Sequence, residues 1–337
     1  MMSEAEVILE IKNLQTYFWN NGKRLRAADD LSYRVRRGEC VAMIGESGSG
    51  KTVGALSVLR LIPYPPGLIV GGQVLFHGRD ILEMTDRELR RLRGKSISMI
   101  FQEPSAALDP VMTVGKQIAE SLRLHQGMGK RAALERAVEM LRRVGIPNPE
   151  QRARQYPFEF SGGMQQRAMI AMAMCCQPEV LIADEPTTAL DVTVQAQVLE
   201  QLNELRRETG TALIIITHNL GVVARYADTV NIMYGGRIVE SGSPYDIFSA
   251  PHHPYTIGLV RAVPRLDLPR SYGLHAIPGE PPDMSRIPKE ACAFAARCAY
   301  ASEECRTRRP PLDQVGEGHT CACFHMEAAR AEGEKLQ

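Results

Sequence analysis

The chain has 337 residues, a formal net charge of +1 and an apolar fraction of 44%, which together exclude a strongly charged nucleic-acid binder and allow one large or two modest buried cores. No apolar run approaches the roughly 18 residues of a membrane span, and the acidic first residues lack the core of a signal peptide, so we expect a protein that stays in the cytoplasm. In that compartment the eight cysteines are not expected to form structural disulfides.

The first part of the chain has the pattern of β-strands. Residues 7–11 and 31–35 predict two strands, which a polar loop joins. The aromatic residues Tyr17, Phe18 and Trp19 precede that loop. A ring here could stack on an adenine base, but a hydrophobic edge strand explains the same residues.

A glycine-rich loop follows the buried strand that residues 41–44 predict. Residues 45–52 read Gly-Glu-Ser-Gly-Ser-Gly-Lys-Thr and match the P-loop pattern G-x-x-x-x-G-K-S/T, with the apolar residues of a helix behind them. The three glycines let successive backbone N–H groups turn toward a phosphate chain, and the helix that starts at Lys51 adds its dipole. We predict that Lys51 reaches the β- and γ-phosphates and that the Thr52 hydroxyl ligates Mg²⁺. A chance glycine-rich turn is the alternative.

Strands and helices then alternate. Residues 73–76 predict a short strand, and Thr85 with Glu88 three residues later predicts a capping box at the start of a charged helix. Residues 97–101 predict the next strand, which ends at Gln102. A polar residue at the carboxyl end of a strand is where α/β sheets place ligand contacts, although a lone Gln is also common in solvated loops.

The pattern is helical from residue 104 to residue 145, with apolar residues at three- and four-residue spacing. A second helical stretch follows after residue 160. Within this stretch Ser161 predicts the N-cap of a long apolar helix that runs through Met174. Gly162 and Gly163 at its start leave the first backbone donors open to an anion. By itself, Ser-Gly-Gly is a common way to begin a helix.

Two further strands end in polar residues. Residues 180–183 are wholly apolar, as in a central parallel strand, and lead into Asp184 and Glu185. Asp184 is suited to supporting Mg²⁺, and Glu185 is suited to polarising an attacking water as a general base. Residues 213–216 predict another buried strand, and His218 soon after it is placed to touch a γ-phosphate, although a single histidine is commonly structural.

Six features occur in this order: the P-loop, Gln102, the Ser161 segment, Asp184-Glu185, Leu190-Asp191 and His218. Together they resemble the ATP-binding (ATPase) subunit of an ABC transporter over roughly residues 7–250. The resemblance implies an α/β P-loop ABC ATPase core over residues 1–250, with an antiparallel β subdomain and a helical subdomain at about residues 104–178. It also implies ATP and Mg²⁺ as cofactors, and two ATPase subunits that close head to tail on two ATP molecules.

The resemblance also implies roles for individual residues. The catalytic residues would be Lys51, Gln102, Glu185 and His218. The nucleotide-binding residues would be Phe18, Gly45, Glu46, Ser47, Gly48, Ser49, Gly50, Lys51, Thr52, Gln102, Asp184, Ser161, Gly162, Gly163, Gln165 and Asp191, of which the Ser161 segment contacts the partner's ATP and Asp191 lies at the dimer seam. The Mg²⁺ site would be formed by Thr52, Gln102 and Asp184. Tyr17 is the alternative to Phe18 on the adenine, and Asn219 follows His218 where the family commonly has Asp.

Residues 251–337 resemble the C-terminal extension of the oligopeptide, dipeptide and nickel importer ATPases, through His253-Pro254-Tyr255-Thr256, residues 277–282 and a cysteine cluster. The resemblance implies a dipeptide-importer type of subunit at the cytoplasmic face of the inner membrane, where it hydrolyses ATP to power import of peptides or similar small solutes. Its partners would be two permeases, a second and non-identical ATPase and, indirectly, a periplasmic solute-binding protein, with no nucleic acid. Nickel, opine or glycoside import, a soluble ABC ATPase acting on ribosomes or nucleic acid, and a redox-sensing module are the alternatives.

The cysteine cluster comprises Cys292, Cys298, Cys305, Cys321 and Cys323. Its spacing does not match an ordinary zinc site, and four thiolates in this compartment suit an iron–sulfur cluster. The resemblance implies a 4Fe–4S cluster on Cys292, Cys298, Cys305 and Cys321, with Cys323 as the alternative fourth ligand. The remaining cysteines lie in apolar or helical contexts and are expected in the core: Cys40, Cys175 and Cys176.

Overall fold

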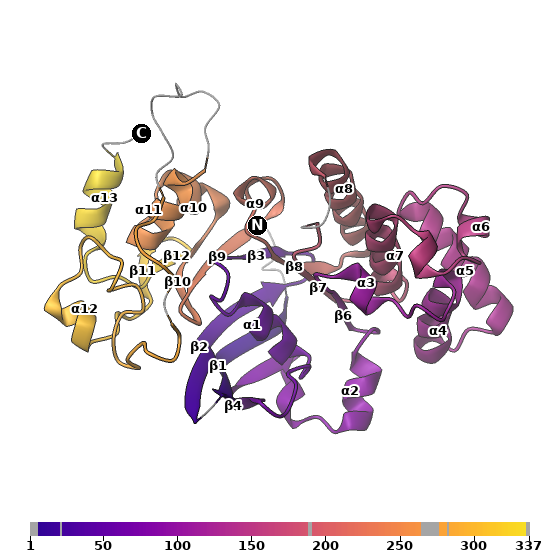
Figure 1. Ribbon diagram of the computed structural model, residues 1–337, viewed down its shortest axis with the longest axis horizontal. Coiled ribbons are helices and arrows are strands. Elements are labelled where there is room, and N and C mark those ends of the chain that lie inside the picture. The colour runs from indigo at the N-terminus through magenta and orange to yellow at the C-terminus, as the bar shows by residue number, and fades with distance from the viewer. Residues whose placement is uncertain (1–5, 21, 188–190, 264–275, 282, 335–337) are drawn as a thin grey trace. The chain divides into compact units, whose positions relative to one another are not determined.

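The computed structural model describes residues 6–20, 22–187, 191–263, 276–281 and 283–334 (Figure 1). The chain divides into two compact units, each built from several stretches of sequence. We call Met1–Leu9, Val35–Cys40 and Asp80–Ile216 the helical unit, and Glu10–Arg34, Val41–Arg79 and Thr217–Gln337 the P-loop unit.

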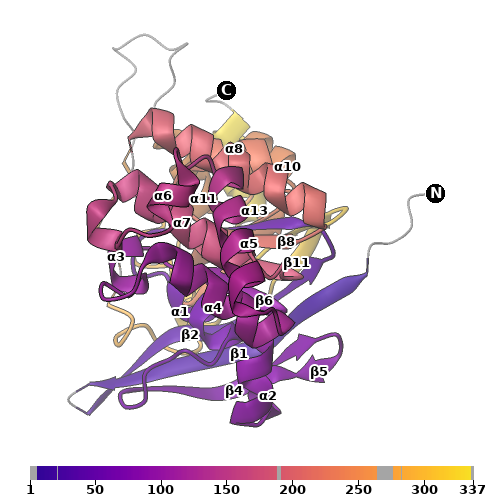
Figure 2. The same ribbon diagram turned by 90° about the vertical axis from the view of Figure 1, so that its right-hand side faces the viewer.

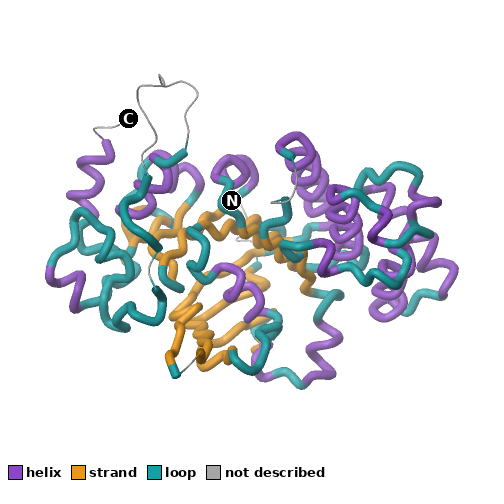
Figure 3. The backbone as a smooth tube through the Cα atoms, in the orientation of Figure 1, coloured by secondary structure: helices purple, strands orange, loops and turns teal. Residues whose placement is uncertain are grey.

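Helices make up most of the helical unit (Figure 3). They are α2 (Asp86–Leu92), α3 (Pro104–Ala107), α4 (Val114–Gln126), α5 (Lys130–Arg143), α6 (Pro149–Arg152), α7 (Gly162–Met174) and α8 (Val192–Thr209), with short 3-10 turns at Ile81–Glu83 and Pro157–Glu159. Its strands β6 (Ile97–Ile100), β7 (Val180–Asp184) and β8 (Ala212–Ile216) are parallel and pair in the order β6-β7-β8. The stretch expected as a helical subdomain, residues 104–178, contains α3 to α7.

Local sequence signals account for these elements. Every residue of β7 and β8 is buried, as the apolar run at residues 180–183 and the wholly apolar β8 predict for central strands. The capping box before α2 is present: Thr85 Oγ1 accepts a hydrogen bond from the backbone N–H of Glu88, whose carboxylate accepts one from the N–H of Thr85 at 2.9 Å. Ser161 caps α7, and the helix runs to Met174 as predicted.

The P-loop unit contains two groups of strands. Most of one four-stranded sheet, in the order β2-β1-β4-β5, lies in it, and β1, β2 and β4 run side by side in Figure 2. In the other group, β3 pairs in parallel with β9, and β9, β10, β12 and β11 follow as antiparallel neighbours. The strands are β1 (Val7–Asn20), β2 (Lys23–Arg36), β3 (Cys40–Ile44), β4 (Gly67–Phe76), β5 (Arg79–Asp80), β9 (Thr229–Tyr234), β10 (Arg237–Gly242), β11 (Asp313–Gly316) and β12 (His319–Cys321).

The helices of this unit are α1 (Lys51–Val58), α9 (Leu220–Tyr226), α10 (Pro244–Ser249), α11 (Pro254–Arg261), α12 (Glu303–Thr307) and α13 (Met326–Glu334). With parallel and antiparallel strands and many helices, the predicted α/β class is confirmed. The first strands are longer than predicted: β1 and β2 continue through the polar segment that we expected to be a loop. Ladder hydrogen bonds extend a hairpin past its buried part, where one or both faces carry polar side chains.

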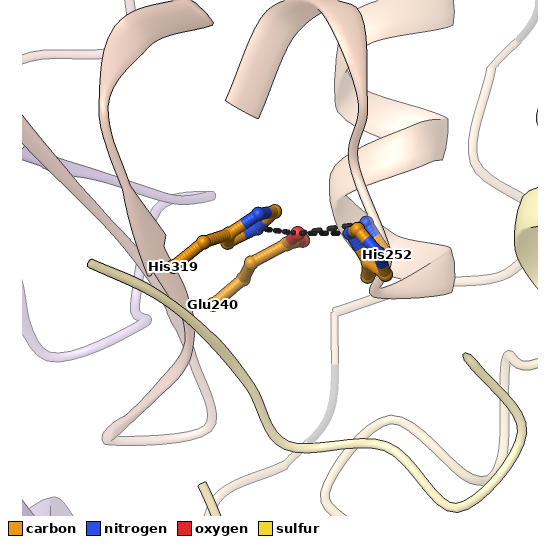
Figure 4. Close-up of side chains that lie close together, drawn as sticks. All are labelled: Glu240, His252 and His319. Atoms are coloured by element: carbon orange, nitrogen blue, oxygen red, sulfur yellow. Dashed lines mark hydrogen bonds and ion pairs between the residues drawn. The ribbon is translucent and has the colours of Figure 1, made fainter. Parts of the chain in front are cut away.

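A buried carboxylate holds the start of the C-terminal extension to β10. Glu240 accepts hydrogen bonds from the backbone N–H groups of His252 (2.7 Å) and His253 (3.0 Å), and its Oε1 lies 2.8 Å from Nε2 of His319 on β12 (Figure 4). Burial alone would raise the pKa of Glu240, but these hydrogen bonds hold the pKa below its usual value. The ionised carboxylate is already occupied by these donors, so we assign the cluster a structural role.

His253 begins α11 and is itself buried. Its Nδ1 accepts a hydrogen bond from the backbone N–H of Tyr255 at 3.1 Å, which caps the helix. Burial lowers the pKa of His253 to about 4, so the ring is neutral at physiological pH. A neutral ring is the form that can accept this hydrogen bond.

This buried histidine predicts a loss of stability in acid. Between its unfolded pKa of 6.5 and its folded pKa of about 4, the unfolded chain binds more protons, so stability falls as the pH drops through that window, by at most about 3 kcal/mol. In His253→Asn the side-chain oxygen can cap the same N–H without titrating. We expect the urea midpoint of the natural chain to fall more than that of the variant between about pH 7.5 and about pH 5. An equal fall in both would contradict the assignment.

Candidate functional site

The loop between β3 and α1 comes so close to neighbouring backbone that only glycine fits at two positions. A Cβ atom on Gly50 would lie 2.0 Å from the carbonyl oxygen of Ala27, and one on Gly45 would lie 2.2 Å from that of Met233. Gly50 also has φ of 99°, a left-handed conformation that side chains disfavour. The backbone is therefore folded tightly here, as a phosphate-binding loop requires.

Lys51 points back into this loop. Its side chain is buried, and Nζ donates hydrogen bonds to the carbonyl oxygens of Gly45 (2.7 Å) and Glu46 (2.9 Å) and to Ser49 Oγ (3.3 Å). Thr52 is exposed in the first turn of α1, which contains no acidic residue and has no side-chain cap. A buried ammonium group beside an uncapped helix N-terminus favours a bound anion.

Glu46 has partners that sequence reasoning missed. Its carboxylate receives two hydrogen bonds from the Arg297 guanidinium, Nη1 to Oε2 at 2.6 Å and Nη2 to Oε1 at 3.2 Å. Its backbone N–H donates to the hydroxyl of Tyr255 at 2.8 Å. Both partners belong to the C-terminal extension, and no spacing rule connects residues this far apart in the chain. The prediction that Glu46 contributes to nucleotide binding thus concerns a residue whose side chain contacts Arg297 and whose carbonyl oxygen contacts Lys51.

The two aromatic alternatives on β1 have different surroundings. The Tyr17 ring is buried, and its hydroxyl donates to Asp29 Oδ1 at 2.8 Å; burial and the Asp29 charge raise the pKa of Tyr17 to about 12. Phe18 is half-buried and lies on the other face of the strand, the face on which the Thr16 hydroxyl contacts that of Ser57 in α1 at 2.7 Å. Of the two rings, Phe18 is the one on the side of α1.

In the helical unit, the structure brings together two residues that were predicted separately. Gln102, just after β6, donates from Nε2 to Oε2 of Glu185 at 2.9 Å. Glu185 follows the buried Asp184 at the end of β7 and has φ of 46°, while its N–H donates to the carbonyl oxygen of Ile216 at 2.9 Å. A non-glycine residue in this conformation costs about 1–3 kcal/mol and is typical of functional sites.

The start of α7 is exposed. Ser161 and Gly162 are open to solvent, and a Cβ atom on Gly162 would meet no other atom. Ser161 Oγ accepts from the N–H of Met164, and Gln165 Nε2 donates to the carbonyl oxygen of Pro157 at 2.9 Å, which fixes the preceding turn. Among the remaining predicted residues of the two loops, Ser49 is buried. The others are half-buried or exposed: Gly163, Ser47 and Gly48.

Two further predicted residues lie at element ends. His218 is exposed after β8, and the neighbouring Asn219 caps α9 by accepting from the N–H groups of Gly221 (3.0 Å) and Val222 (3.3 Å). Asn219 thus serves as an effective N-cap in the place where Asp is common. Asp191 is exposed and caps α8. Leu190, which precedes it, lies outside the described residues.

Four cysteines line one small cavity in the C-terminal extension. They are Cys292, Cys298, Cys305 and Cys323, and the rest of the lining is mostly apolar and aromatic. Cys321 does not line it: this residue is buried on β12 opposite Glu240. The structure therefore places Cys323, rather than Cys321, beside the other three.

Burial favours the protonated form of two of these thiols, those of Cys292 and Cys323. Burial raises the pKa of Cys292 to about 11 and that of Cys323 to about 12, and nearby thiolates would add to both shifts. A bound cationic metal centre reverses this preference, because it stabilises thiolates directly. The donor set, four thiols in a mostly apolar lining, suits an iron–sulfur cluster.

Comparison with known proteins gives two family matches. The model for "ABC transporter" matches residues 28–188, and that for "Oligopeptide/dipeptide transporter, C-terminal region" matches residues 239–305. The described residues include no helix that is both long and apolar enough to cross a membrane.

Curated relatives are similar over nearly the whole chain. The oligopeptide transport ATP-binding protein OppD of Salmonella typhimurium is 49% identical over 95% of this chain and 94% of its own length. OppD of Bacillus subtilis is 47% identical over 96% and 91%, and a probable peptide ABC transporter ATP-binding protein of Sinorhizobium fredii is 48% identical over 95% and 96%.

Solved structures are similar over the larger part of the chain. The ATP-binding cassette MJ0796, solved as a dimer in a post-hydrolysis state with ADP and phosphate, has a TM-score of 0.63 and 25% identity, and covers 70% of this chain and 98% of that one. The protein cbiO1 from Clostridium perfringens, part of the cbiONQ transporter complex, has a TM-score of 0.61 and 26% identity, covering 75% and 95%.

Proposed function

This chain belongs to the ABC transporter family, and we propose that it is the ATP-hydrolysing subunit of an importer of peptides or similar small solutes. The ATPase assignment is supported by the tightly folded glycine-rich loop around the buried Lys51 and by the hydrogen bond between Gln102 and Glu185. The peptide assignment is supported by relatives 47–49% identical, whose names are those of peptide transport proteins, and by the match to the oligopeptide/dipeptide C-terminal region.

In this proposal the P-loop unit binds the triphosphate. Lys51 exchanges its bonds to the loop carbonyls for oxygens of the β- and γ-phosphates, and the first N–H groups of α1 bind phosphate oxygens. The exposed Thr52 hydroxyl contributes to the Mg²⁺ shell, as do Asp184 and Gln102. Phe18 stacks on the adenine, which its place on the α1 side of β1 supports.

Glu185 is proposed to orient the attacking water and to accept its proton. The hydrogen bond from Gln102 holds its carboxylate in one orientation, and the positive φ of Glu185 fixes where the side chain leaves the strand. His218 contacts the γ-phosphate. Because phosphoryl transfer is catalysed mostly by positioning and charge neutralisation, the exact direction of these groups determines the rate.

A second ATPase subunit completes each site. The exposed start of α7, with Ser161, Gly162 and Gly163, has the open backbone donors needed to bind the partner's γ-phosphate, and Gln165 and Asp191 lie at the seam. We propose a non-identical partner ATPase, two permeases and a periplasmic solute-binding protein, with this subunit peripheral at the cytoplasmic face of the membrane. ATP then drives closure through its greater affinity for the closed state.

The first test is Glu185→Gln. The amide keeps the size of the side chain but cannot accept a proton, so we expect the ATPase rate to fall at least about 100-fold while the ATP dissociation constant changes little. Glu208→Gln, at an exposed position at the end of α8, is the matched control and should keep the natural rate. Unchanged turnover in Glu185→Gln would remove Glu185 as the base.

The importer assignment is tested by affinity purification of the tagged full-length chain from gently solubilised membranes. We expect two permeases and a second ATPase to co-purify, and a co-purifying binding protein to indicate the solute. Recovery with ribosomes or nucleic-acid enzymes, and without any membrane protein, would instead favour a soluble ABC ATPase.

We further propose that Cys292, Cys298, Cys305 and Cys323 hold a 4Fe–4S cluster. When bound, such a group supplies a covalent cross-link and a redox centre. The chain's own contribution is the mostly apolar lining, which brings together cysteines that are far apart in the sequence.

Paired serine variants distinguish the two candidate fourth ligands. After anaerobic purification we expect Cys323→Ser to lose iron and its brown colour, because it removes a sulfur from the cavity, and Cys321→Ser to keep both. Iron and sulfide analysis with absorption spectra gives the readout. Loss of iron in Cys321→Ser alone would restore Cys321 as the ligand, and colourless protein with stoichiometric zinc would replace the cluster proposal.

A further inference from the structure

Arg297 uses all of its donors in a buried position. Its side chain is 6% exposed, and two of its five N–H groups bind the Glu46 carboxylate as a parallel pair. The other three point at the carbonyl oxygens of Pro278 (2.8 Å) and Ile277 (3.4 Å) and at the hydroxyl of Tyr234 (3.4 Å). A guanidinium with a partner for every N–H group is held in one orientation. A displacement of the Arg297 backbone would therefore also move the Glu46 carboxylate that it binds.

Glu46 connects Arg297 to the lysine of the P-loop. Its carboxylate binds Arg297, its N–H binds the hydroxyl of Tyr255, and its carbonyl oxygen accepts from Lys51 Nζ at 2.9 Å. Each polar group of Glu46 is thus engaged, two by the C-terminal extension and one by the group that is proposed to bind phosphate. A change in Arg297 or Tyr255 therefore reaches Lys51 through a single residue.

Arg297 and Tyr255, the two partners of Glu46, also contact residues that line the four-cysteine cavity. Arg297 directly precedes Cys298, and its N–H donates to the carbonyl oxygen of Phe294 at 3.0 Å. The Phe294 ring lines the cavity and packs on the ring of Tyr255, with centroids 5.5 Å apart. Two connections, one polar and one aromatic, therefore join the cavity to Glu46.

We propose that Arg297 and Tyr255 are positioning residues that make nucleotide binding at the P-loop depend on whether the four-cysteine cavity holds its metal centre. The proposal rests on the proposed cluster for the identity of the occupant. Binding a metal centre draws the four sulfur atoms to fixed positions, which sets the backbone at Cys298 and the ring of Phe294. Arg297 and Tyr255 then hold Glu46, and with it the backbone of the P-loop, in the position that phosphate binding needs. The occupied cavity favours nucleotide binding because the loop is preorganised.

The coupling is reciprocal, which gives a readout independent of ATPase activity. If the metal centre strengthens nucleotide binding, nucleotide must stabilise the metal centre by the same factor. We expect a non-hydrolysable ATP analogue to slow the release of iron to a chelator in the full-length chain. In Arg297→Gln the analogue should have little effect on that release.

The decisive experiment compares ATP dissociation constants before and after iron removal in three full-length proteins. Iron removal should weaken binding about tenfold in the natural chain and in Arg286→Gln, a control on the same extension whose exposed side chain pairs with Asp283. Arg297→Gln should bind weakly in both states. The proposal would be overturned if iron removal changed the ATP dissociation constant of Arg297→Gln as much as that of the natural chain. It would also be overturned if iron removal left the ATP dissociation constant of the natural chain unchanged.

Tyr255→Phe separates failure of this inference from failure of the cluster proposal or of folding. It removes one hydroxyl and keeps the ring packing, so we expect normal iron content and weaker ATP binding. If the purified protein contains no iron, the cluster proposal is wrong. The role of the contacts to Glu46 is still tested in that case by the ATP dissociation constants of Tyr255→Phe and Arg297→Gln. Natural affinity in both variants would exclude the positioning role whatever the metal content.

Discussion

The phosphate-binding loop depends on two positions where a single added carbon atom would collide with backbone. At Gly45 and Gly50 the neighbouring carbonyl oxygens belong to Met233 and Ala27, which lie on β9 and β2. The loop is therefore shaped by the strands around it as much as by its own sequence. The N–H of Gly236 also binds the carbonyl oxygen of Ser49 at 3.0 Å, so the turn after β9 supports the loop directly.

Buried charges join the C-terminal extension to the rest of the P-loop unit. Arg237 on β10 binds the Asp29 carboxylate and donates to the carbonyl oxygen of Lys289 at 3.0 Å. Glu240 and Arg297 make further hydrogen bonds between the extension and the rest of the unit. Removing one partner of such a pair typically costs about 3–5 kcal/mol, because the other charge is left buried and unpaired. The extension is thus an integrated part of the unit, in a position to influence the nucleotide loop.

The features that local rules describe could be read from the sequence. The P-loop between strand and helix, the capping box at Thr85, the cap at Ser161 and the wholly apolar strand before Asp184 each depend on residues within a few positions of one another. Helix caps, glycine conformations and strand burial are short-range effects, so the local sequence indicates them directly. The order of six short motifs, from the P-loop to His218, was enough to indicate the family, because six such signals in one order are very specific.

The sequence by itself thus determined the fold class, the nucleotide loop and the residue types of the site. Tertiary structure alone decided that Arg297 and Tyr255 bind Glu46, that Gln102 meets Glu185, and that Cys323 rather than Cys321 joins the other three cysteines. Cys321 and Cys323 are two residues apart, and only the end of β12 and the pairing of Cys321 opposite Glu240 separate their surroundings. Contacts between distant residues follow from how strands and loops pack in space, and no spacing along the chain encodes that packing.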